Sequence, residues 1–468
     1  MKVLPVRQFR KSLLLMMALP SSQHCHMIDT GLHSKHYSSP ISRRQCFSNM
    51  VSLFPSADKS VAARLRHPEV HVQITNVTVI KLNFDMPIPM ADAVHYMPSR
   101  PTLLVQVHTD EGIVGLGEAA AYGGYLESTE AIILGELRET IVGQDPFRIE
   151  RLWSMMASRA HQRGRRGMLM MAISGIDIAL WDIVGQATGT PVYRLLGAYH
   201  ETLDAYASAG FYAEGKTPDA LAEEAGTYAS RGFKTIKIKV GRNPELMTNM
   251  LHDMVCPNYA TASLEEDVER VRLVRQAIGK GVKLAIDANN AWTPSVALKF
   301  MREVEPLDIA WLEEPVSTDD IDGSALVAHR LDTPVSGYET ETGLPGFREL
   351  IARKAVDIVQ PDVIWTGGIT ESRKVAALAQ AYGLSVIPHV FSSAVALISN
   401  MHLIASLPNA GLLEFDQNPN PLRNELFEEP IHPSPDGKVS LPDRPGLGVT
   451  LNHETIERYR IERHRPND

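Results

Sequence analysis

A regular alternation of short apolar segments and amphipathic stretches runs through the chain after residue 200. Eight apolar segments have the length and composition of buried strands: 203–207, 235–240, 283–288, 309–313, 335–339, 357–361, 384–388 and 411–415. The stretch 264–278, between two of them, carries apolar residues at helical spacing. Repeated strand–helix units predict a parallel sheet. Because eight such units match a TIM-type barrel in size, we expect a (β/α)7β barrel of the α/β class.

An open, doubly wound sheet is the alternative to a barrel. Dinucleotide-binding sheets of that class carry a G-x-G-x-x-G turn after their first strand. No such turn follows the segment 203–207, so the sequence favours the barrel.

Residues before 200 have a different pattern. Apolar and polar residues alternate over 72–82 and 103–108, and helical periodicity follows over 128–143, 146–160 and 167–185. Strands followed by helices predict a separate α+β domain. We therefore expect an N-terminal extension (1–57), an α+β capping domain (70–198), the barrel (199–416) and a C-terminal segment packed on the capping domain (417–468).

Charge and cysteine content restrict the partners. The 468 residues have a net charge of −9, which predicts neither nucleic-acid binding nor attraction to an anionic membrane. No apolar run approaches the ~18 residues of a membrane-spanning helix, so none is expected. The cysteines Cys25, Cys46 and Cys256 lack the spacing of a zinc site or a disulfide framework.

Two stretches stand outside this pattern. The extension 1–57 is basic and Ser-rich, with Asp29 as its one acidic residue. It resembles a mitochondrial transit peptide, while a secretory segment and a later start at Met50 are alternatives; without a transit peptide we expect a cytoplasmic protein. The stretch 242–262 lengthens a strand–helix connection where ~2–6 residues are usual. It is either a lid or an error in the gene structure.

Polar side chains stand at the carboxyl ends of the predicted strands, where barrel enzymes carry their chemistry. Lys237 and Lys239 alternate within 235–240 and therefore share one face. We expect each cation to lower the pKa of the other, which is how a lysine becomes a base near neutral pH. A solvated basic face on an edge strand is the alternative.

Three successive predicted strands end in a carboxylate: Asp287, Glu313 and Glu339. One such residue alone would be an ordinary helix cap or loop residue. Mg²⁺ binds a small number of carboxylates and keeps positions for water or substrate. The three together therefore predict one Mg²⁺ per active site, with Mn²⁺ as the alternative metal.

The last three predicted strands lead into Asp362, His389 and Glu414. A carboxylate beside an imidazole orients the ring and raises its pKa, which makes an acid–base dyad of Asp362 and His389. Glu414 either binds a substrate oxygen or caps the next segment. Cations around a bound carboxylate would stabilise the enediolate formed when the neighbouring carbon loses a proton.

From about 70 to 450 the chain resembles the mandelate racemase/muconate lactonizing branch of the enolase superfamily, in its mandelate racemase subgroup. The resemblance rests on the helix 172–182, the KxK pair and the order of the strand-end residues. It implies that Lys239 is a base, that Glu414 contacts the substrate carboxylate, and that the residues around 90–100 form a loop over the barrel mouth. Tyr338 departs from the glycine that many relatives have before the third metal ligand.

The resemblance implies the first chemical step and leaves several outcomes. Dehydration of an acid sugar is the preferred prediction for the overall reaction, because dehydratases are numerous in the subgroup. Racemisation or epimerisation, with Lys239 and His389 serving opposite faces, is the alternative. A cycloisomerase of the muconate type is less expected, because that branch has a second lysine near the sixth strand. A barrel without enzymatic activity is the alternative of another class. We also expect a small carboxylate substrate and a homo-oligomer.

Overall fold

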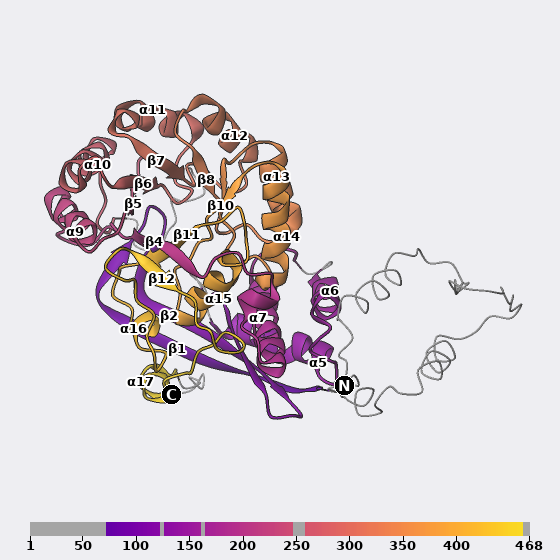
Figure 1. The fold of residues 1–468 in the computed structure, drawn as a ribbon. Helices are drawn as coiled ribbons and strands as arrows, with labels where there is room; N and C mark the ends of the chain where they lie inside the picture. Colours follow the sequence, from indigo (N-terminus) through magenta and orange to yellow (C-terminus); the bar gives the residue numbers. More distant parts are fainter. Residues whose placement is uncertain (1–71, 122–125, 161–163, 247–257, 462–468) are drawn as a thin grey trace, which may run out of the picture. The chain divides into compact units, whose positions relative to one another are not determined.

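The computed structural model describes residues 72–121, 126–160, 164–246 and 258–461 (Figure 1). The extension 1–57, the three cysteines and residues 247–257 lie outside the described residues, so the expectations about targeting and about the long connection stay predictions. The described residues from Val72 onward belong to one compact unit.

Eight parallel strands form the barrel within the described residues (Figure 1). They are β4 (Thr202–Ser208), β5 (Thr235–Lys239), β6 (Lys283–Asp287), β7 (Ile309–Glu313), β8 (Val335–Gly337), β9 (Ile358–Val359), β10 (Ser385–Val386) and β11 (Leu412–Asp416). Their order is β10-β9-β8-β7-β6-β5-β4-β11, and a parallel bridge from Val386 to Ala410 connects the two ends of this order. The predicted fold class is therefore confirmed.

Three strands are at least two residues shorter than their sequence segments predict: β8, which ends at Gly337 instead of 339, and β9 and β10. The segments 357–361 and 384–388 end in Pro361 and Pro388, whereas β9 and β10 stop at Val359 and Val386. Proline has no N–H group to donate to a strand ladder, so the pairing ends before it.

Seven helices connect the barrel strands in the described part of the chain. They are α9 (Pro218–Ser230), α10 (Leu264–Ile278), α11 (Pro294–Val304), α12 (Ile321–Arg330), α13 (Gly343–Ala352), α14 (Gly368–Ala381) and α15 (Ala394–Ile404). The bounds of α10 match the sequence prediction. This helix begins with a capping box, in which the Ser263 side chain accepts from Glu266 N and the Glu266 side chain accepts from Ser263 N.

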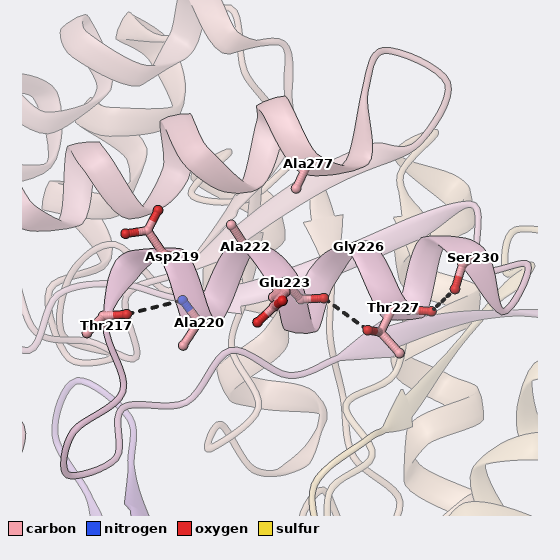
Figure 2. A pocket seen from close by; sticks show the side chains of 9 residues that line it. All are labelled: Thr217, Asp219, Ala220, Ala222, Glu223, Gly226, Thr227, Ser230 and Ala277. Atoms are coloured by element: carbon pink, nitrogen blue, oxygen red, sulfur yellow. Dashed lines mark hydrogen bonds between the residues drawn. The ribbon is translucent and has the colours of Figure 1, made fainter.

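An open hollow of about 760 Å³ lies along α9, with Ala277 of α10 at its edge (Figure 2). Its titratable residues are Asp219 and Glu223, and its other lining residues are small or hydroxylated. Because it follows the helices on the outside of the barrel, it has no part in the site at the strand ends.

The N-terminal domain is an antiparallel sheet covered by helices. Its strands are β1 (Ile74–Ala91), β2 (Tyr96–Thr109) and β3 (Val114–Ala119), and its helices are α4 (Leu126–Ile132), α5 (Arg138–Ile141), α6 (Ile149–Ala160), α7 (Met168–Thr188) and α8 (Val192–Leu195). β1 continues to Ala91, well beyond the predicted run 72–82. The predicted helix 128–143 is divided by a π-helical turn at Ile133–Leu137.

Helix α7 is long and apolar enough to cross a membrane, with a mean hydropathy of 1.6 over an 18-residue window. The expectation that no apolar stretch approaches this length was therefore wrong. The helix is buried over 83% of that window, as a core helix would be. It packs so closely on β3 that a Cβ at Gly117 would lie 2.0 Å from the Gly175 carbonyl oxygen. This contact explains the glycine at position 117.

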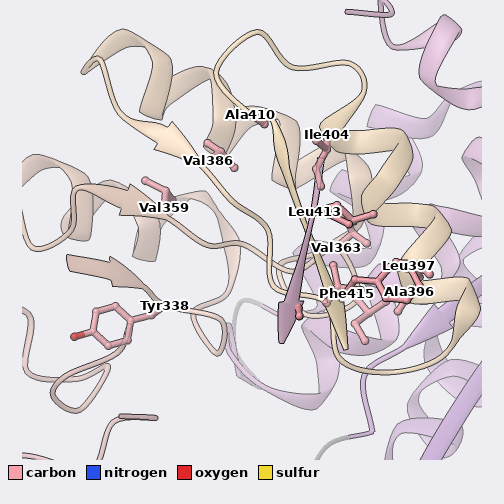
Figure 3. Packing of buried hydrophobic residues seen from close by; sticks show 14 of the residues in the cluster. Tyr338, Val359, Val363, Val386, Ala396, Leu397, Ile404, Ala410, Leu413 and Phe415 are labelled. Atoms are coloured by element: carbon pink, nitrogen blue, oxygen red, sulfur yellow. The ribbon is translucent and has the colours of Figure 1, made fainter. Parts of the chain in front are cut away.

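One hydrophobic core joins the barrel to the N-terminal sheet. It includes Val359, Val386 and Leu413 of the barrel strands (Figure 3) and extends to Leu82 and Leu104 of β1 and β2. Burial of this apolar surface stabilises the contact between sheet and barrel. The N-terminal sheet is therefore held in a fixed position beside the barrel.

The chain after β11 contacts both the barrel and the N-terminal domain. It contains α16 (Pro421–Asn424), β12 (Lys438–Ser440) and α17 (His453–Tyr459). β12 pairs antiparallel with β4, and Ile461 N donates to the Lys81 carbonyl oxygen of β1 at 2.9 Å. The division of the chain at 198 and 416 stays a prediction.

Candidate active site

Three buried carboxylates converge at the carboxyl ends of neighbouring strands. Asp287 ends β6, Glu313 ends β7, and Glu339 follows β8. Asp287 and Glu313 are direct partners in the parallel register. One oxygen from each of the three residues lies within 4.8 Å of the others. The structure therefore brings together the three residues that the sequence predicts as metal ligands.

The donor set fits a divalent cation. Burial raises the pKa of Glu313 to about 7 and also raises the pKa of Glu339. Glu339 Oε2 accepts no hydrogen bond from the described residues. Buried carboxylates need a compensating charge, and Mg²⁺ prefers carboxylate oxygens. Asp287, Glu313 and Glu339 are thus suited to hold such an ion.

Both lysines of β5 point at this cluster. Lys237 donates a hydrogen bond to Glu313 Oε1, and its Nζ lies 2.8 Å from Glu414 Oε1. Lys239 donates to Asp287 Oδ2. The solvated edge-strand alternative is therefore excluded, since Lys237 is 0% and Lys239 4% exposed.

Each lysine was expected to lower the pKa of the other, and Lys237 does lower the pKa of Lys239, but the net pKa shift is upward at both lysines. Burial lowers the pKa of Lys239, and so does the charge of Lys237, but the carboxylates, with Asp287 foremost, outweigh both and raise it. For Lys237, Glu313 and Glu414 likewise outweigh burial and raise the pKa. Alternation in the sequence shows that the two lysines share a face. Their distances to the neighbouring carboxylates are set only by the fold.

His389 and Asp362 form the predicted pair. His389 Nδ1 lies 2.8 Å from Asp362 Oδ2, and His389 Nε2 lies 3.3 Å from Glu339 Oε2. Asn400 Nδ2 donates to Asp362 Oδ1 at 3.1 Å and holds the carboxylate in place. Although burial lowers the pKa of His389, Glu339 and Asp362 raise it to about 10. These two carboxylates favour the protonated imidazole, which suits His389 to donate a proton.

Glu414 completes the cluster from β11. It accepts a hydrogen bond from Val390 N at 2.9 Å and lies against Lys237. Although burial raises the pKa of Glu414, Lys237 lowers it to about 2. Glu414 is thus an ionised acceptor inside the site, and the cap of a following segment is not its role here.

The sequence reasoning missed residues that hold Glu313. Trp311 Nε1 donates to Glu313 Oε2 at 3.0 Å, and Gln360 Nε2 donates to the same oxygen at 2.9 Å. Alternation along β7 puts Trp311 and Glu313 on one face. The contact between these two side chains could therefore have been predicted from the sequence. Gln360 lies on another strand, and its contact depends on strand order.

The N-terminal domain reaches the same strand ends. Met86, Met90 and Met97 form a buried cluster with Phe211 and Phe391. Lys239 Nζ lies 4.9 Å from the centre of the Phe211 ring, which stacks on Phe391 at 5.4 Å. The predicted loop 90–100 comprises the last two residues of β1, the turn 92–95 and the first residues of β2.

Fold and site together are those of a barrel enzyme with a buried carboxylate triad, suited to a divalent cation, and two candidate acid–base groups. The family described as "Enolase C-terminal domain-like" matches residues 220–455. The N-terminal domain of mandelate racemase and muconate lactonizing enzymes matches residues 74–197. The chain belongs to the mandelate racemase/muconate lactonizing enzyme family of the enolase superfamily, as the sequence motifs predict.

Known proteins from this family extend over most of the chain. It is 38% identical to an arabinonate dehydratase of Saccharolobus solfataricus, over 76% of this chain and 90% of that protein. It is 31% identical to a D-galactarolactone cycloisomerase of Agrobacterium fabrum, over 83% and 99% of the two chains. A racemase structure from Streptomyces coelicolor with bound magnesium superposes with a TM-score of 0.73 at 30% identity, over 83% and 100%. The alternative of a barrel without enzymatic activity is therefore set aside.

Proposed function

We propose that this enzyme is a Mg²⁺-dependent hydro-lyase that dehydrates an acid sugar. The observation that carries the proposal is the buried carboxylate triad with Lys239 on one strand and the Asp362–His389 pair on another. The similarity to an arabinonate dehydratase supports water loss as the overall reaction.

Asp287, Glu313 and Glu339 would hold the metal ion. When bound, the ion supplies positive charge beside the substrate carboxylate and offsets the Asp287 charge that raises the pKa of Lys239. Lys237 is placed to donate a hydrogen bond to a substrate oxygen, and the ionised Glu414 is placed to accept one.

Lys239 takes the proton from the carbon next to the substrate carboxylate, which leaves an enediolate. A protonated His389 gives its proton to the hydroxyl on the next carbon. The carbon–oxygen bond breaks with its electron pair on oxygen, water departs, and the remaining enol becomes a 2-keto acid. Asp362 keeps the imidazole ring oriented during this transfer.

Cycloisomerisation is a second candidate, favoured by the 31% identity to a galactarolactone cycloisomerase. Racemisation uses the same two groups on opposite faces of the substrate carbon. Incubation with a panel of acid sugars and their lactones in D₂O separates the three. A 2-keto acid indicates dehydration, a product of unchanged composition with an altered ring indicates cycloisomerisation, and deuterium exchange alone indicates racemisation. The absence of product and exchange with every compound would contradict the proposal.

We also propose that the protein is a homo-oligomer. The sedimentation coefficient of the purified chain tests this state. A monomer at micromolar concentration would contradict it.

A further inference from the structure

Helix α15 carries a buried asparagine that the proposed mechanism does not use. Asn400 is 0% exposed, and its Nδ2 donates to Asp362 Oδ1 at 3.1 Å. The same Nδ2 donates to the Ala396 carbonyl oxygen at 3.1 Å, and the Asn400 Oδ1 accepts from Val363 N at 3.4 Å. Because acceptors face Nδ2 and a donor faces Oδ1, these partners fix one orientation of the amide.

The two carboxylate oxygens of Asp362 have separate partners. Oδ1 accepts from Asn400 Nδ2 and, at 3.1 Å, from Ile364 N. Oδ2 lies 2.8 Å from His389 Nδ1. The torsion about the Cβ–Cγ bond of an aspartate has only a weak preference of its own. The donors on Oδ1 therefore decide where Oδ2 meets the imidazole.

The start of α15 is anchored on the N-terminal sheet. Glu118, which lies in β3, accepts hydrogen bonds from Ser393 Oγ at 2.5 Å and from Ala396 N at 2.8 Å. Ala396 thus contacts Glu118 through its N–H group and Asn400 through its carbonyl oxygen. A shift of the helix would break these buried bonds, so the Asn400 amide is preorganised for Asp362.

The other nitrogen of the His389 ring faces the catalytic cluster. Its Nε2 lies 3.3 Å from Glu339 Oε2. Because the ring is rigid, a displacement of Nδ1 beside Asp362 also moves Nε2, the nitrogen on the side of the cluster. A misplacement of about 1 Å in a reacting group can reduce a rate by roughly 100-fold. The orientation of the Asp362 carboxylate therefore matters for proton transfer by His389.

We propose that Asn400 is a positioning residue for the loss of water: it holds Asp362 so that His389 points at the leaving hydroxyl. The inference rests on the proposed function, in which Lys239 takes the first proton and His389 gives the second. Without the Asn400 amide, proton removal by Lys239 continues and protonation of the hydroxyl by His389 slows. The enediolate then returns to substrate more often, with a proton from Lys239.

The test follows the two fates of the enediolate in D₂O with the Mg²⁺-loaded enzyme. Loss of the hydroxyl gives the 2-keto acid, whereas a deuteron from the solvent-exchanged ammonium of Lys239 gives substrate labelled next to the carboxylate. Asn400→Leu keeps roughly the size of the side chain and removes its donor. We expect the ratio of labelled substrate to 2-keto acid to rise by roughly 10- to 100-fold. Asn400→Ala, which is smaller, should give a rise of the same kind.

A second measurement does not depend on turnover. A proton that joins His389 Nδ1 to a carboxylate gives a downfield NMR signal, which is assigned by its loss in His389→Asn. Asn400→Leu should shift this signal upfield. Asn409→Ala is the matched control, because the Asn409 amide donates to the carbonyl oxygens of Ala376 and Leu384, at 3.2 and 3.1 Å. The control should match the wild type in both measurements.

In an active enzyme, an unchanged ratio in Asn400→Leu would overturn the inference. Equal losses of labelled substrate and of 2-keto acid would also overturn it, because they would indicate a general structural defect. A wild type that forms no 2-keto acid from any acid sugar contradicts the proposed function. In that case the NMR signal decides whether Asn400 positions the Asp362–His389 pair, and an unchanged signal in Asn400→Leu would exclude that role.

Discussion

Glu118 of β3 connects the N-terminal sheet to the segment that follows His389, and its removal should both destabilise the protein and reduce activity. The carboxylate is 0% exposed. It accepts hydrogen bonds from Ser393 Oγ at 2.5 Å and from Ala396 N at 2.8 Å, and a further one from the Ser392 hydroxyl. These contacts hold the start of α15.

Glu118→Ala leaves two buried donors, Ser393 Oγ and Ala396 N, without their acceptor. Each unsatisfied buried donor costs ~1–3 kcal/mol, and relief from burying a carboxylate offsets part of this cost, so we expect a loss of about 2–4 kcal/mol in the free energy of unfolding. Urea denaturation followed by tryptophan fluorescence measures it. Glu150→Ala, which removes an exposed ion pair with Lys374, is the control and should change stability by less than about 1 kcal/mol. A Glu118→Ala loss below about 1 kcal/mol would refute the reasoning.

Three further predictions concern the site and the core. Lys239→Ala and His389→Asn should each reduce kcat by at least about 10³-fold while Mn²⁺ binding, followed by calorimetry, is retained; full activity in either would contradict the assigned roles. Removal of divalent ions with a chelator should stop turnover, and added Mg²⁺ should restore it. Activity that persists without metal would contradict a role for the ion in the reaction. Burial raises the pKa of Asp177 to about 7. Its contribution to stability is therefore fully present below pH ~4 and is lost as the pH rises through 7. Asp177→Asn should flatten this part of the stability–pH curve measured by thermal unfolding, and an unchanged curve would exclude Asp177 as its source.

The strand-end residues were predictable because one determinant is local and the other follows from the repeated strand–helix units. Alternation decides which side chains share a face, and strand order in a barrel places Asp287, Glu313 and Glu339 at one end. The lysine pKa values were not predictable, since they depend on distances to Glu313 and Glu414 that only the folded barrel sets.

The resemblance marks residues around 90–100 as a loop, but the contact between Asp92 and His95 was not predicted, for a related reason. It lies in a turn, and no strand-end pattern marks it. Its proximity to Lys239 and Asp287 depends on how the N-terminal sheet packs on the barrel, through contacts such as those of Arg242. Packing between domains leaves little periodic signal in a sequence.

The connection after β5 is closed at its base by contacts between its two ends. Ala262 N donates to the Arg242 carbonyl oxygen at 3.0 Å, and Asn243 Nδ2 donates to the Ala262 carbonyl oxygen at 2.9 Å. Lengthening a loop whose ends are already joined costs little, about 0.6 kcal/mol for each doubling. A change in the length of this connection would therefore leave Lys239 and Arg242 in their places.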